Sequence, residues 1–277
     1  MHPFTTLKTL GAAALLAAAL HAAPALAVEE VPFITTPDNV TLAMLEIAGV
    51  GRRDHVIDLG SGDGRIVITA ARRFGASGLG VEIDPALVER SNANAVKAGV
   101  AARVQFREQD LFKTDLAPAS VITMYLLPDV NLQLRPALLD LKPGTRLVSH
   151  DWDMAEWAPD RTLTLDVPDK KIGLDKRSRV HLWVVPAKVE GLWCGPRGAT
   201  LQLAQQFQRV QGRAGPARDS AQAWGHLDGA ALHLAARGAT LRLAVDGDQA
   251  RVTAASGPWA GWRSARFTRT GGAICSG

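Results

Sequence analysis

The sequence predicts an α/β fold, in which a largely parallel sheet carries helices on both faces, followed by a small antiparallel β domain. Short apolar strands alternate with helical stretches from Val28 to about Pro186, a pattern typical of a covered parallel sheet. Beyond this stretch the runs become short and alternating, with Gly-rich turns such as Asp246-Gly247-Asp248, which favours the hairpins of a β-sandwich or barrel. We therefore expect one domain over 28–188 and a second over 189–277.

Each element of this fold has its own signal in the sequence. Strands are expected at 55–59, 78–83, 104–107, 120–125, 145–150, 162–167 and 180–185, and helices at 65–74, 85–98 and 128–141. Pro85 suits a first helical turn, and Pro136 predicts an irregularity in the third helix. In the second domain the alternating runs are 199–210, 230–236, 240–245 and 250–254, and the Pro- and Gly-rich stretch 211–218 is the longest predicted loop.

The first 27 residues have the three parts of a secretory signal. Lys8 supplies a positive charge, Leu10 to Leu20 is apolar, and Ala25-Leu26-Ala27 has the small residues that signal peptidase reads. The apolar run is too short to span a bilayer. We expect cleavage after Ala27 and an exported protein, periplasmic if the source is a Gram-negative bacterium. The alternative is an uncleaved, anchoring N-terminus.

Cysteines and charge add two expectations about the second domain. Cys194 and Cys275 are the only cysteines, and in an oxidising compartment they would close a long loop, contributing about 4 kcal/mol; the alternative is two free thiols. Neither they nor the histidines have the short spacing of a metal site. From Glu190 onward ten Arg, no Lys and five acids give a net charge of +5. This basic domain is suited to lipid headgroups or an acidic partner, or is simply a solvated surface. The overall charge of +4 is too small to indicate nucleic acid.

A glycine-rich loop follows the first predicted strand. Asp58 ends that strand, Gly60, Ser61, Gly62 and Asp63 form the loop, and a helix begins immediately after it. Glycines permit positive φ and a close approach of ligand to backbone. The spacing is G-x-G-x-G and not the G-x-x-G ending of a dinucleotide site, and the two acids would repel a pyrophosphate. The loop therefore predicts a site for a cationic ligand.

Acidic residues also end the next two strands. Glu82 lies 22 residues after Gly60, where a carboxylate can accept both hydroxyls of a ribose. Asp110 follows the third strand, within reach of an adenine amino group. S-adenosylmethionine carries a ribose, an adenine, a sulfonium and an ammonium but no phosphate. The three carboxylates together predict that it is the cofactor.

Three segments carry a family resemblance, and they are Asp58-Leu59-Gly60-Ser61-Gly62-Asp63-Gly64-Arg65-Ile66-Val67, Gly80-Val81-Glu82-Ile83-Asp84-Pro85 and Asp110-Leu111-Phe112. They resemble the class I methyltransferases, which have a Rossmann-like seven-stranded sheet. Within these, the chain is similar to the protein-lysine methyltransferases that include the adenine nucleotide translocase and ATP synthase c-subunit enzymes. Val31-Pro32-Phe33-Ile34-Thr35-Thr36-Pro37 resembles that family's lead-in, which implies that Thr36 helps to close the cofactor site and that Leu111 lines it. The resemblance covers about Val31 to Trp157. It leaves out the β domain, and the export signal departs from the eukaryotic members.

The resemblance implies a protein lysine as methyl acceptor, without locating its site. Tyr125, within Met124-Tyr125-Leu126-Leu127-Pro128, is placed to orient an amine, or else packs the end of a strand. This segment is not the Asn/Asp-Pro-Pro-Tyr of many amide and nucleobase methyltransferases, so a nucleic-acid acceptor is not expected. His150, flanked by Asp151, is a candidate base, or else a structural residue. Two other functions stay open, namely methylation of a small molecule or lipid, and non-catalytic binding of S-adenosylmethionine outside the cell.

Overall fold

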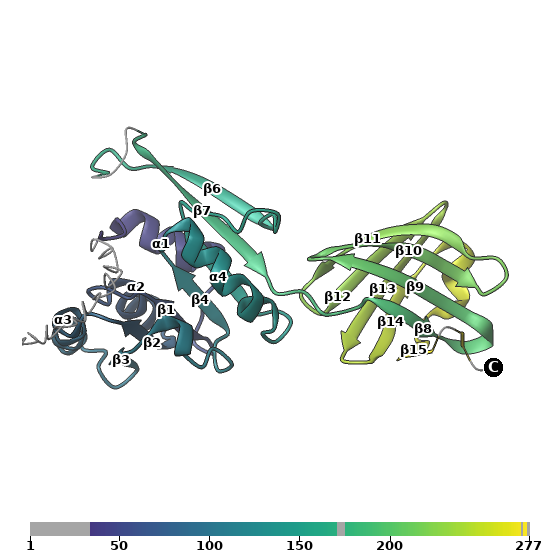
Figure 1. Ribbon diagram of the computed structural model, residues 1–277, viewed down its shortest axis with the longest axis horizontal. Helices are drawn as coiled ribbons and strands as arrows, with labels where there is room; N and C mark the ends of the chain where they lie inside the picture. Colours follow the sequence, from purple (N-terminus) through teal and green to yellow (C-terminus); the bar gives the residue numbers. More distant parts are fainter. Residues whose placement is uncertain (1–33, 171–174, 273, 276–277) are drawn as a thin grey trace, which may run out of the picture. The chain divides into compact units, whose positions relative to one another are not determined.

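The computed structural model describes residues 34–170, 175–272, 274 and 275 (Figure 1). The expected signal over 1–27 and its cleavage after Ala27 lie outside these residues. In the described part of the chain no helix combines the length and apolar character needed to span a bilayer.

The first domain contains the expected seven-stranded sheet. Its strands are β1 (His55–Leu59), β2 (Ser77–Glu82), β3 (Val104–Glu108), β4 (Val121–Met124), β5 (Arg146–His150), β6 (Arg161–Asp166) and β7 (Arg177–Val184). They lie in the order β3-β2-β1-β4-β5-β7-β6. The first five run parallel, whereas β7 is antiparallel to β5 and forms a hairpin with β6, at one edge of the sheet in Figure 1. Strand order reverses at β1, where ligands bind in open α/β sheets.

Helices cover both faces of this sheet, as the sequence predicted. They are α1 (Asp38–Ile47), α2 (Arg65–Thr69), α3 (Pro85–Lys97) and α4 (Pro128–Leu139), and a π-helical turn, Ala70–Phe74, continues α2. The helix expected at 65–74 is therefore α-helical only in its first half. On one face α1 and α2 pack over Val56, Val121 and Val148. On the other, Leu134 and Leu138 of α4 pack over the alternate residues of the same strands. Helix α1 was not among the predicted elements.

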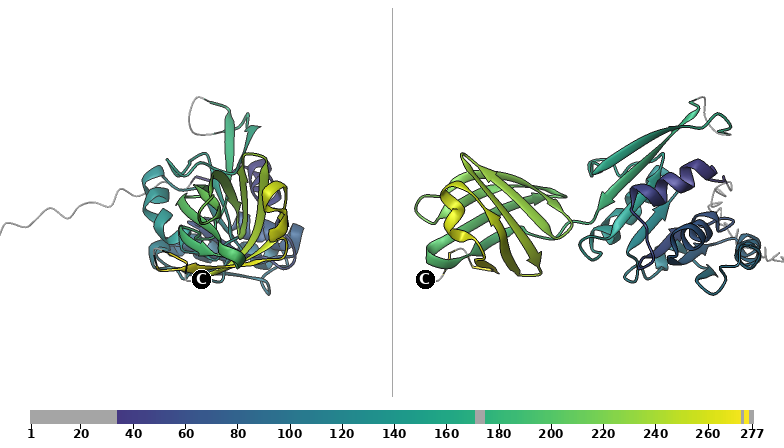
Figure 2. Two further views of the ribbon diagram at one scale, coloured as in Figure 1. Left: turned by 90° about the vertical axis from the view of Figure 1, so that its right-hand side faces the viewer. Right: turned by 180° about the vertical axis from the view of Figure 1, so that it is seen from behind.

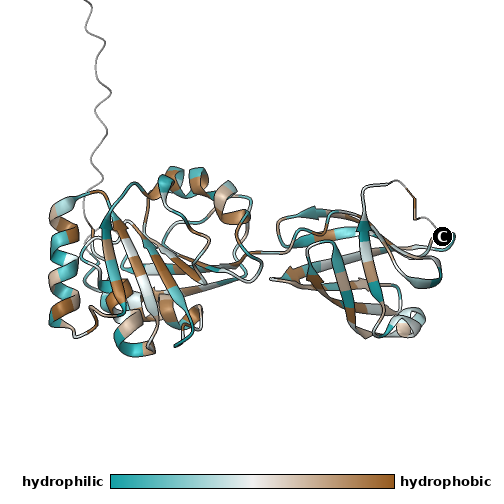
Figure 3. Cartoon of the chain, turned by 90° about the horizontal axis from the view of Figure 1, so that it is seen from below, coloured by the Kyte–Doolittle hydropathy of each residue, from teal (hydrophilic) through white to brown (hydrophobic). Residues whose placement is uncertain are grey.

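The second domain is a closed antiparallel barrel, which confirms the predicted β domain. Its strands are β8 (Gly191–Cys194), β9 (Ala199–Gln206), β10 (Arg209–Pro216), β11 (Ala221–Asp228), β12 (Ala231–Ala236), β13 (Ala239–Asp246), β14 (Gln249–Ala255) and β15 (Arg266–Thr270). Figure 2 shows them with the short helix Gly257–Trp262, drawn in yellow. Hydrophobic and hydrophilic residues alternate along the strands (Figure 3). The inward side chains, among them Trp193, Trp259 and Phe267, fill one buried core.

The stretch predicted as the longest loop is instead a strand. Residues 209–216 form β10, and the run expected at 199–210 turns at Phe207 into the β9–β10 hairpin. A Cβ atom on Gly212 would lie 1.9 Å from the carbonyl oxygen of Gln202. The glycine therefore allows two strands to approach closely, whereas the composition of this stretch predicts a loop. The predicted disulfide is present, joining Cys194 and Cys275 across 81 residues with a Cα–Cα distance of 5.6 Å.

Candidate functional site

The glycine-rich loop between β1 and α2 is held in a shape that requires its glycines. Gly60, Gly62 and Gly64 have φ angles of 71°, 54° and 79°. A Cβ atom on Gly64 would lie 2.6 Å from the ring of Phe106, and one on Gly60 would lie 3.0 Å from Leu126. Any other residue at these positions would be strained by the backbone angle or by the close contact. The loop therefore presents bare backbone at the carboxyl end of β1.

Asp58 is buried at the end of β1, with 2% of its surface exposed. The hydroxyl of Thr123 donates a hydrogen bond of 2.7 Å to its carboxylate. Burial raises the pKa of Asp58 to about 8, and the negative charges of Glu82 and Asp63 add to this effect. A cation bound nearby would offset these costs and favour the ionised carboxylate. The electrostatics of this position therefore suit a positively charged ligand.

Glu82 ends β2, the strand next to β1, and its carboxylate closes against the loop. One oxygen accepts a hydrogen bond of 2.9 Å from the backbone N–H of Gly62. The other accepts from the backbone N–H groups of Ile83 and Asp84, at 2.8 and 3.2 Å. Glu82 is only half-buried, so its carboxylate is fixed in position and still within reach of a ligand.

Asp110 follows β3, the next strand in the sheet. Its carboxylate accepts a hydrogen bond of 2.9 Å from the backbone N–H of Phe112 and lies 3.2 Å from the ammonium of Lys113. The Phe112 bond, with smaller effects from Lys113, holds the pKa of Asp110 below its ordinary value. Leu111 is half-buried at the start of a short 3₁₀ turn. The three predicted carboxylates thus end three adjacent strands.

The structure gives Ser61 and Asp63 different surroundings from the other loop residues. The carboxylate of Asp63 accepts hydrogen bonds from Nε and a terminal nitrogen of Arg65, at 2.9 and 2.7 Å. Although burial opposes ionisation, these bonds hold the pKa of Asp63 below its ordinary value. A contact between Asp63 and a ligand stays a prediction, and the acid repels a pyrophosphate less than the sequence suggested. The buried hydroxyl of Ser61 has no hydrogen-bond partner among the described residues.

The residues beside this loop fit S-adenosylmethionine. The glycines leave room against the backbone, and the buried hydroxyl of Ser61 is unpaired within the described structure. The carboxylates of Asp58, Glu82 and Asp110 are suited to the ammonium, ribose and adenine of this cofactor. When bound, it would supply an electrophilic methyl group on a sulfonium.

A second group of predicted residues meets at the ends of β4 and β5. The rings of Tyr125 and His150 are stacked, with centroids 3.9 Å apart. His150 is 1% exposed, and its Nε2 and Nδ1 lie 3.0 Å from the Ser178 hydroxyl and 3.4 Å from the Thr36 hydroxyl. Burial lowers the pKa of His150 to about 4; the charge of Asp151 opposes this shift. His150 is therefore neutral near pH 7.

Thr36 is joined to the cofactor loop as well. A terminal nitrogen of Arg65 donates a hydrogen bond of 2.9 Å to the backbone carbonyl of Thr36. Arg65 also donates hydrogen bonds to Asp63, so it connects the segment before α1 with the start of α2. Thr36 is thus placed between the glycine-rich loop and His150, and its contact with a cofactor stays a prediction.

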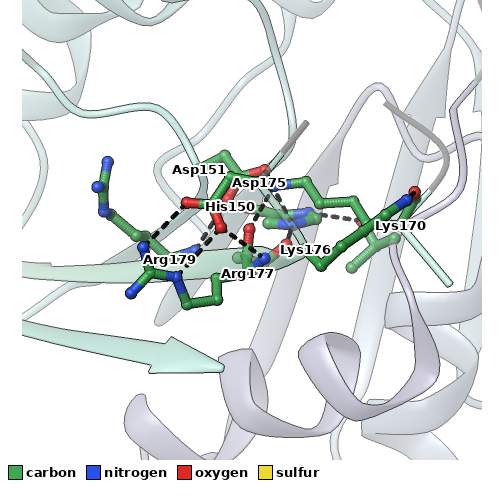
Figure 4. A network of polar contacts seen from close by, with 9 residues as sticks. His150, Asp151, Lys170, Asp175, Lys176, Arg177 and Arg179 are labelled. Atoms are coloured by element: carbon green, nitrogen blue, oxygen red, sulfur yellow. Dashed lines mark hydrogen bonds and ion pairs between the residues drawn. The ribbon is translucent and has the colours of Figure 1, made fainter. Parts of the chain in front are cut away.

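A network of polar contacts continues from His150 (Figure 4). Asp151, whose φ is 64°, accepts a hydrogen bond of 2.8 Å from the backbone N–H of Arg179. Its other oxygen lies 2.7 Å from the ammonium of Lys170 and 3.5 Å from Nε2 of His150. Lys170 also donates a bond of 2.6 Å to the carbonyl of Arg177. Sequence reasoning missed Lys170, because no motif surrounds it and it is far from His150 along the chain.

A pocket of about 410 Å³ opens beside this network. Among the residues that line it are Pro37, Asp38, Tyr125, His150, Asp169 and Lys170. A cavity of about 480 Å³ lies over α1 and α2, lined in part by Arg72 and Asn94, and includes neither Tyr125 nor His150. We therefore take the smaller pocket as the candidate acceptor site. Asp38, which sequence reasoning missed, could have been found from Pro37-Asp38 as a helix start.

Comparisons with known proteins find methyltransferases. Residues 58–161 match a family model described as the ANTKMT methyltransferase domain. A protein-lysine N-methyltransferase of Saccharolobus islandicus is 43% identical over 141 residues, which are 50% of this chain and 88% of that protein. The ATP synthase c-subunit lysine N-methyltransferase of Mus musculus is 38% identical over 112 residues, 40% of this chain. The chain spans 45% of the length of that mouse relative.

A solved structure gives a further likeness. An RNA methyltransferase from Salinibacter ruber, in complex with S-adenosyl-L-homocysteine, is 50% identical, with a TM-score of 0.51. The match covers 56% of this chain and 96% of that one. S-Adenosylhomocysteine is what S-adenosylmethionine becomes once it has given up its methyl group. The chain belongs to the family of S-adenosylmethionine-dependent methyltransferases that includes the lysine methyltransferases of the adenine nucleotide translocase and of the ATP synthase c-subunit.

Proposed function

We propose that this enzyme transfers a methyl group from S-adenosylmethionine to the ε-amine of a protein lysine. The observation that carries the proposal is the position of Lys170. Its ammonium is bound by Asp151 at the edge of the pocket that Tyr125 and His150 line. A lysine side chain is therefore accommodated at the edge of the candidate acceptor site. The names of the relatives from Saccharolobus islandicus and Mus musculus support the same substrate class.

The cofactor-binding roles follow from the strand ends. In this proposal Asp58 balances the positive charge of the cofactor, Glu82 accepts from the ribose and Asp110 from the adenine. The backbone of Gly60, Ser61 and Gly62 lies against the cofactor, with Thr36 and Leu111 at the borders of the site. These residues bind and orient the cofactor.

An acceptor lysine must be neutral to attack, far below its solution pKa of about 10.4. Tyr125 is the side chain that we assign to orient the amine, because it lines the pocket at the end of β4. The sequence suggested His150 as a base. Its burial and its contacts with Thr36 and Ser178 favour a positioning role, in which the neutral imidazole holds the ring of Tyr125.

RNA is the second candidate acceptor, favoured by the name of the Salinibacter ruber structure. Against it, residues 124–128 read Met-Tyr-Leu-Leu-Pro and lack the Asn/Asp-Pro-Pro-Tyr of many base and amide methyltransferases. A small molecule or lipid would use the same cofactor site, and a non-catalytic protein would bind the cofactor without transfer. We also propose export to the periplasm, supported by the signal pattern of residues 1–27 and by the Cys194–Cys275 disulfide, which suits an oxidising compartment.

The test measures transfer from S-adenosylmethionine labelled in its methyl group. The acceptors are a mixture of lysine-containing peptides, the same peptides with arginine in place of lysine, and single-stranded RNA. We expect label in the lysine peptides only, recovered as methyllysine after acid hydrolysis. Glu82→Gln should lower transfer about tenfold or more at cofactor concentrations below saturation, whereas replacing Glu108, which lies opposite Glu82 on β3, by glutamine should not. Label in RNA and not in peptide would overturn the lysine proposal. Binding without transfer to any acceptor would support the non-catalytic alternative.

A further inference from the structure

A row of basic and imidazole side chains crosses the outside of the barrel. In the register of β10 to β13, Arg209 lies opposite His226, His226 opposite His233, and His233 opposite Arg242. Each of the four is followed along its strand by a residue of the buried core, so the row itself faces outward. Strands lie about 4.8 Å apart, and the row therefore extends about 14 Å across four strands.

Protonation of the two histidines would make this row destabilise the barrel. Like charges directly opposite one another on neighbouring strands are destabilising. The rings of His226 and His233 are stacked with centroids 4.7 Å apart and a tilt of 3°, so protonating either one places charge next to its neighbour and an arginine. Burial, His226 and Arg242 lower the pKa of His233, while Asp228 opposes them.

An exposed aromatic residue borders the row. Trp224, the next outward residue to His226 on β11, is 57% exposed and pairs with Gln211 and Ala235. Tryptophan is favoured where a surface meets the boundary between lipid and water. Arginines bind phosphate oxygens with two parallel hydrogen bonds, and this domain has ten of them and no lysine. Single-stranded nucleic acid would instead need several exposed aromatic rings for successive bases.

We propose that Arg209, His226, His233, Arg242 and Trp224 form a binding surface for anionic lipid headgroups. The phosphates lie along the row, and the Trp224 ring enters the interface beside them. Protonation of an imidazole adds positive charge to the row, so attachment strengthens as the pH falls. The surface belongs to the barrel, and its role does not depend on which acceptor the enzyme methylates.

The test is co-sedimentation of the full chain with vesicles of phosphatidylglycerol and phosphatidylcholine in equal parts. Vesicles of phosphatidylcholine alone are the neutral control. The double variant Arg209→Gln, Arg242→Gln should bind the anionic vesicles at least tenfold more weakly, since each arginine near such a surface contributes roughly fivefold. The matched control is Arg251→Gln, Arg266→Gln, a cross-strand pair outside the row that removes the same charge. It should bind nearly as the wild type does. Equal losses in the two double variants would overturn the proposal, as would equal binding to neutral vesicles.

Two further arms separate the remaining explanations. Binding should rise several-fold as the pH is lowered below the ordinary histidine pKa near 6.5, because the pKa of His233 is lowered, and His226→Gln, His233→Gln should remove that rise. A rise that persists in this variant would contradict the role of the imidazoles. Single-stranded RNA added as competitor should leave vesicle binding in place at physiological salt. Displacement that depends on Arg209 and Arg242 would reassign the surface to nucleic acid. Thermal melting confirms that each variant is folded.

Discussion

The ring of Tyr125 lies against the ring of His150, with centroids 3.9 Å apart and planes 29° from parallel. The two residues lie at the ends of β4 and β5, which are neighbouring parallel strands. His150 is buried and neutral, so the Tyr125 ring rests on an uncharged imidazole that contacts the Thr36 and Ser178 hydroxyls. Burial raises the pKa of the Tyr125 hydroxyl, and the charge of Asp151 adds a smaller effect in the same direction. It therefore remains a hydrogen-bond donor or acceptor at neutral pH, without becoming a phenolate.

Replacing Tyr125 by phenylalanine should separate packing from chemistry. The variant keeps the ring stacked on His150, so Tm and the affinity for S-adenosylmethionine should stay near wild type. Loss of the hydroxyl should lower kcat for a lysine peptide about tenfold to a hundredfold, since the amine is no longer oriented. Steady-state kinetics and calorimetric titration make the two measurements. A wild-type kcat would show that Tyr125 only packs the end of its strand.

Asp58→Asn should raise stability at alkaline pH. The folded protein holds the Asp58 proton up to about pH 8, whereas the ordinary pKa of the group is 3.8. Between these values the folded state binds more protons than the unfolded state, so the free energy of unfolding falls as pH rises. Asparagine is neutral throughout and removes this loss. We expect similar Tm values below about pH 4 and a variant several degrees more stable near pH 9, at about 2–4 °C per kcal/mol.

The same substitution should weaken cofactor binding at least tenfold, because the ionised carboxylate is what the cationic ligand needs. In the wild type, affinity should rise with pH up to about 8, and binding at neutral pH should release a proton. Calorimetry in buffers of different ionisation enthalpy measures that proton. Asp140→Asn, an exposed acid on the surface, is the control. A variant with unchanged affinity and unchanged pH dependence would remove Asp58 from the site.

The parts of the site that could be predicted are those that depend on residues close together in the sequence. Asp58, Glu82 and Asp110 each follow an apolar strand, and parallel strands bring their carboxyl ends to one edge. The glycines identify the loop after β1, because its positive φ angles and close contacts require glycine. A largely parallel sheet with helices on both faces follows from the same alternation of elements, whereas the order of its strands does not.

What could not be predicted depends on long-range contacts or on close packing. Lys170 meets Asp151 only because β6 and β7 fold back beside β5, and no pattern near Lys170 indicates a site. The partner of Asp63, Arg65, looks in the sequence like an ordinary helix residue. Strand β10 differs from the predicted loop because its glycines serve the approach of neighbouring backbones, which composition does not distinguish from a turn.

Glu82→Gln tests the ribose contact. The amide oxygen can still accept from the backbone N–H of Gly62, so the loop should keep its shape, but the amide nitrogen cannot accept from the backbone N–H groups of Ile83 and Asp84. Loss of the charge should weaken S-adenosylmethionine binding about tenfold or more, and loss of these two bonds should lower Tm by a few degrees. Glu108→Gln, opposite on β3, should bind as the wild type does. Equal affinities for the two variants would place the ribose elsewhere.

The disulfide should be a main source of stability for the barrel. Replacing Cys194 and Cys275 by alanine releases a loop of 81 residues and should cost about 4 kcal/mol. The Tm of the barrel should fall by at least about 10 °C in calorimetry. Adding reductant should lower the Tm of the wild type to that of the variant, and should leave the Tm of the variant unchanged. A variant as stable as the oxidised wild type would show that the core rings of Trp193 and Phe267 suffice.

Lys170→Met tests whether the enzyme's own lysine competes with the acceptor. The ammonium of Lys170 lies 2.7 Å from the Asp151 carboxylate, and its removal leaves that oxygen free to receive the acceptor ammonium. KM for a lysine peptide should fall several-fold with kcat little changed, and Asp151→Asn should raise KM. Lys176→Met removes the same charge from a side chain that bonds the carbonyl of Lys170, and should leave KM unaltered. A higher KM in Lys170→Met would instead make Lys170 part of the acceptor site, because its ammonium would then be holding Asp151 in place.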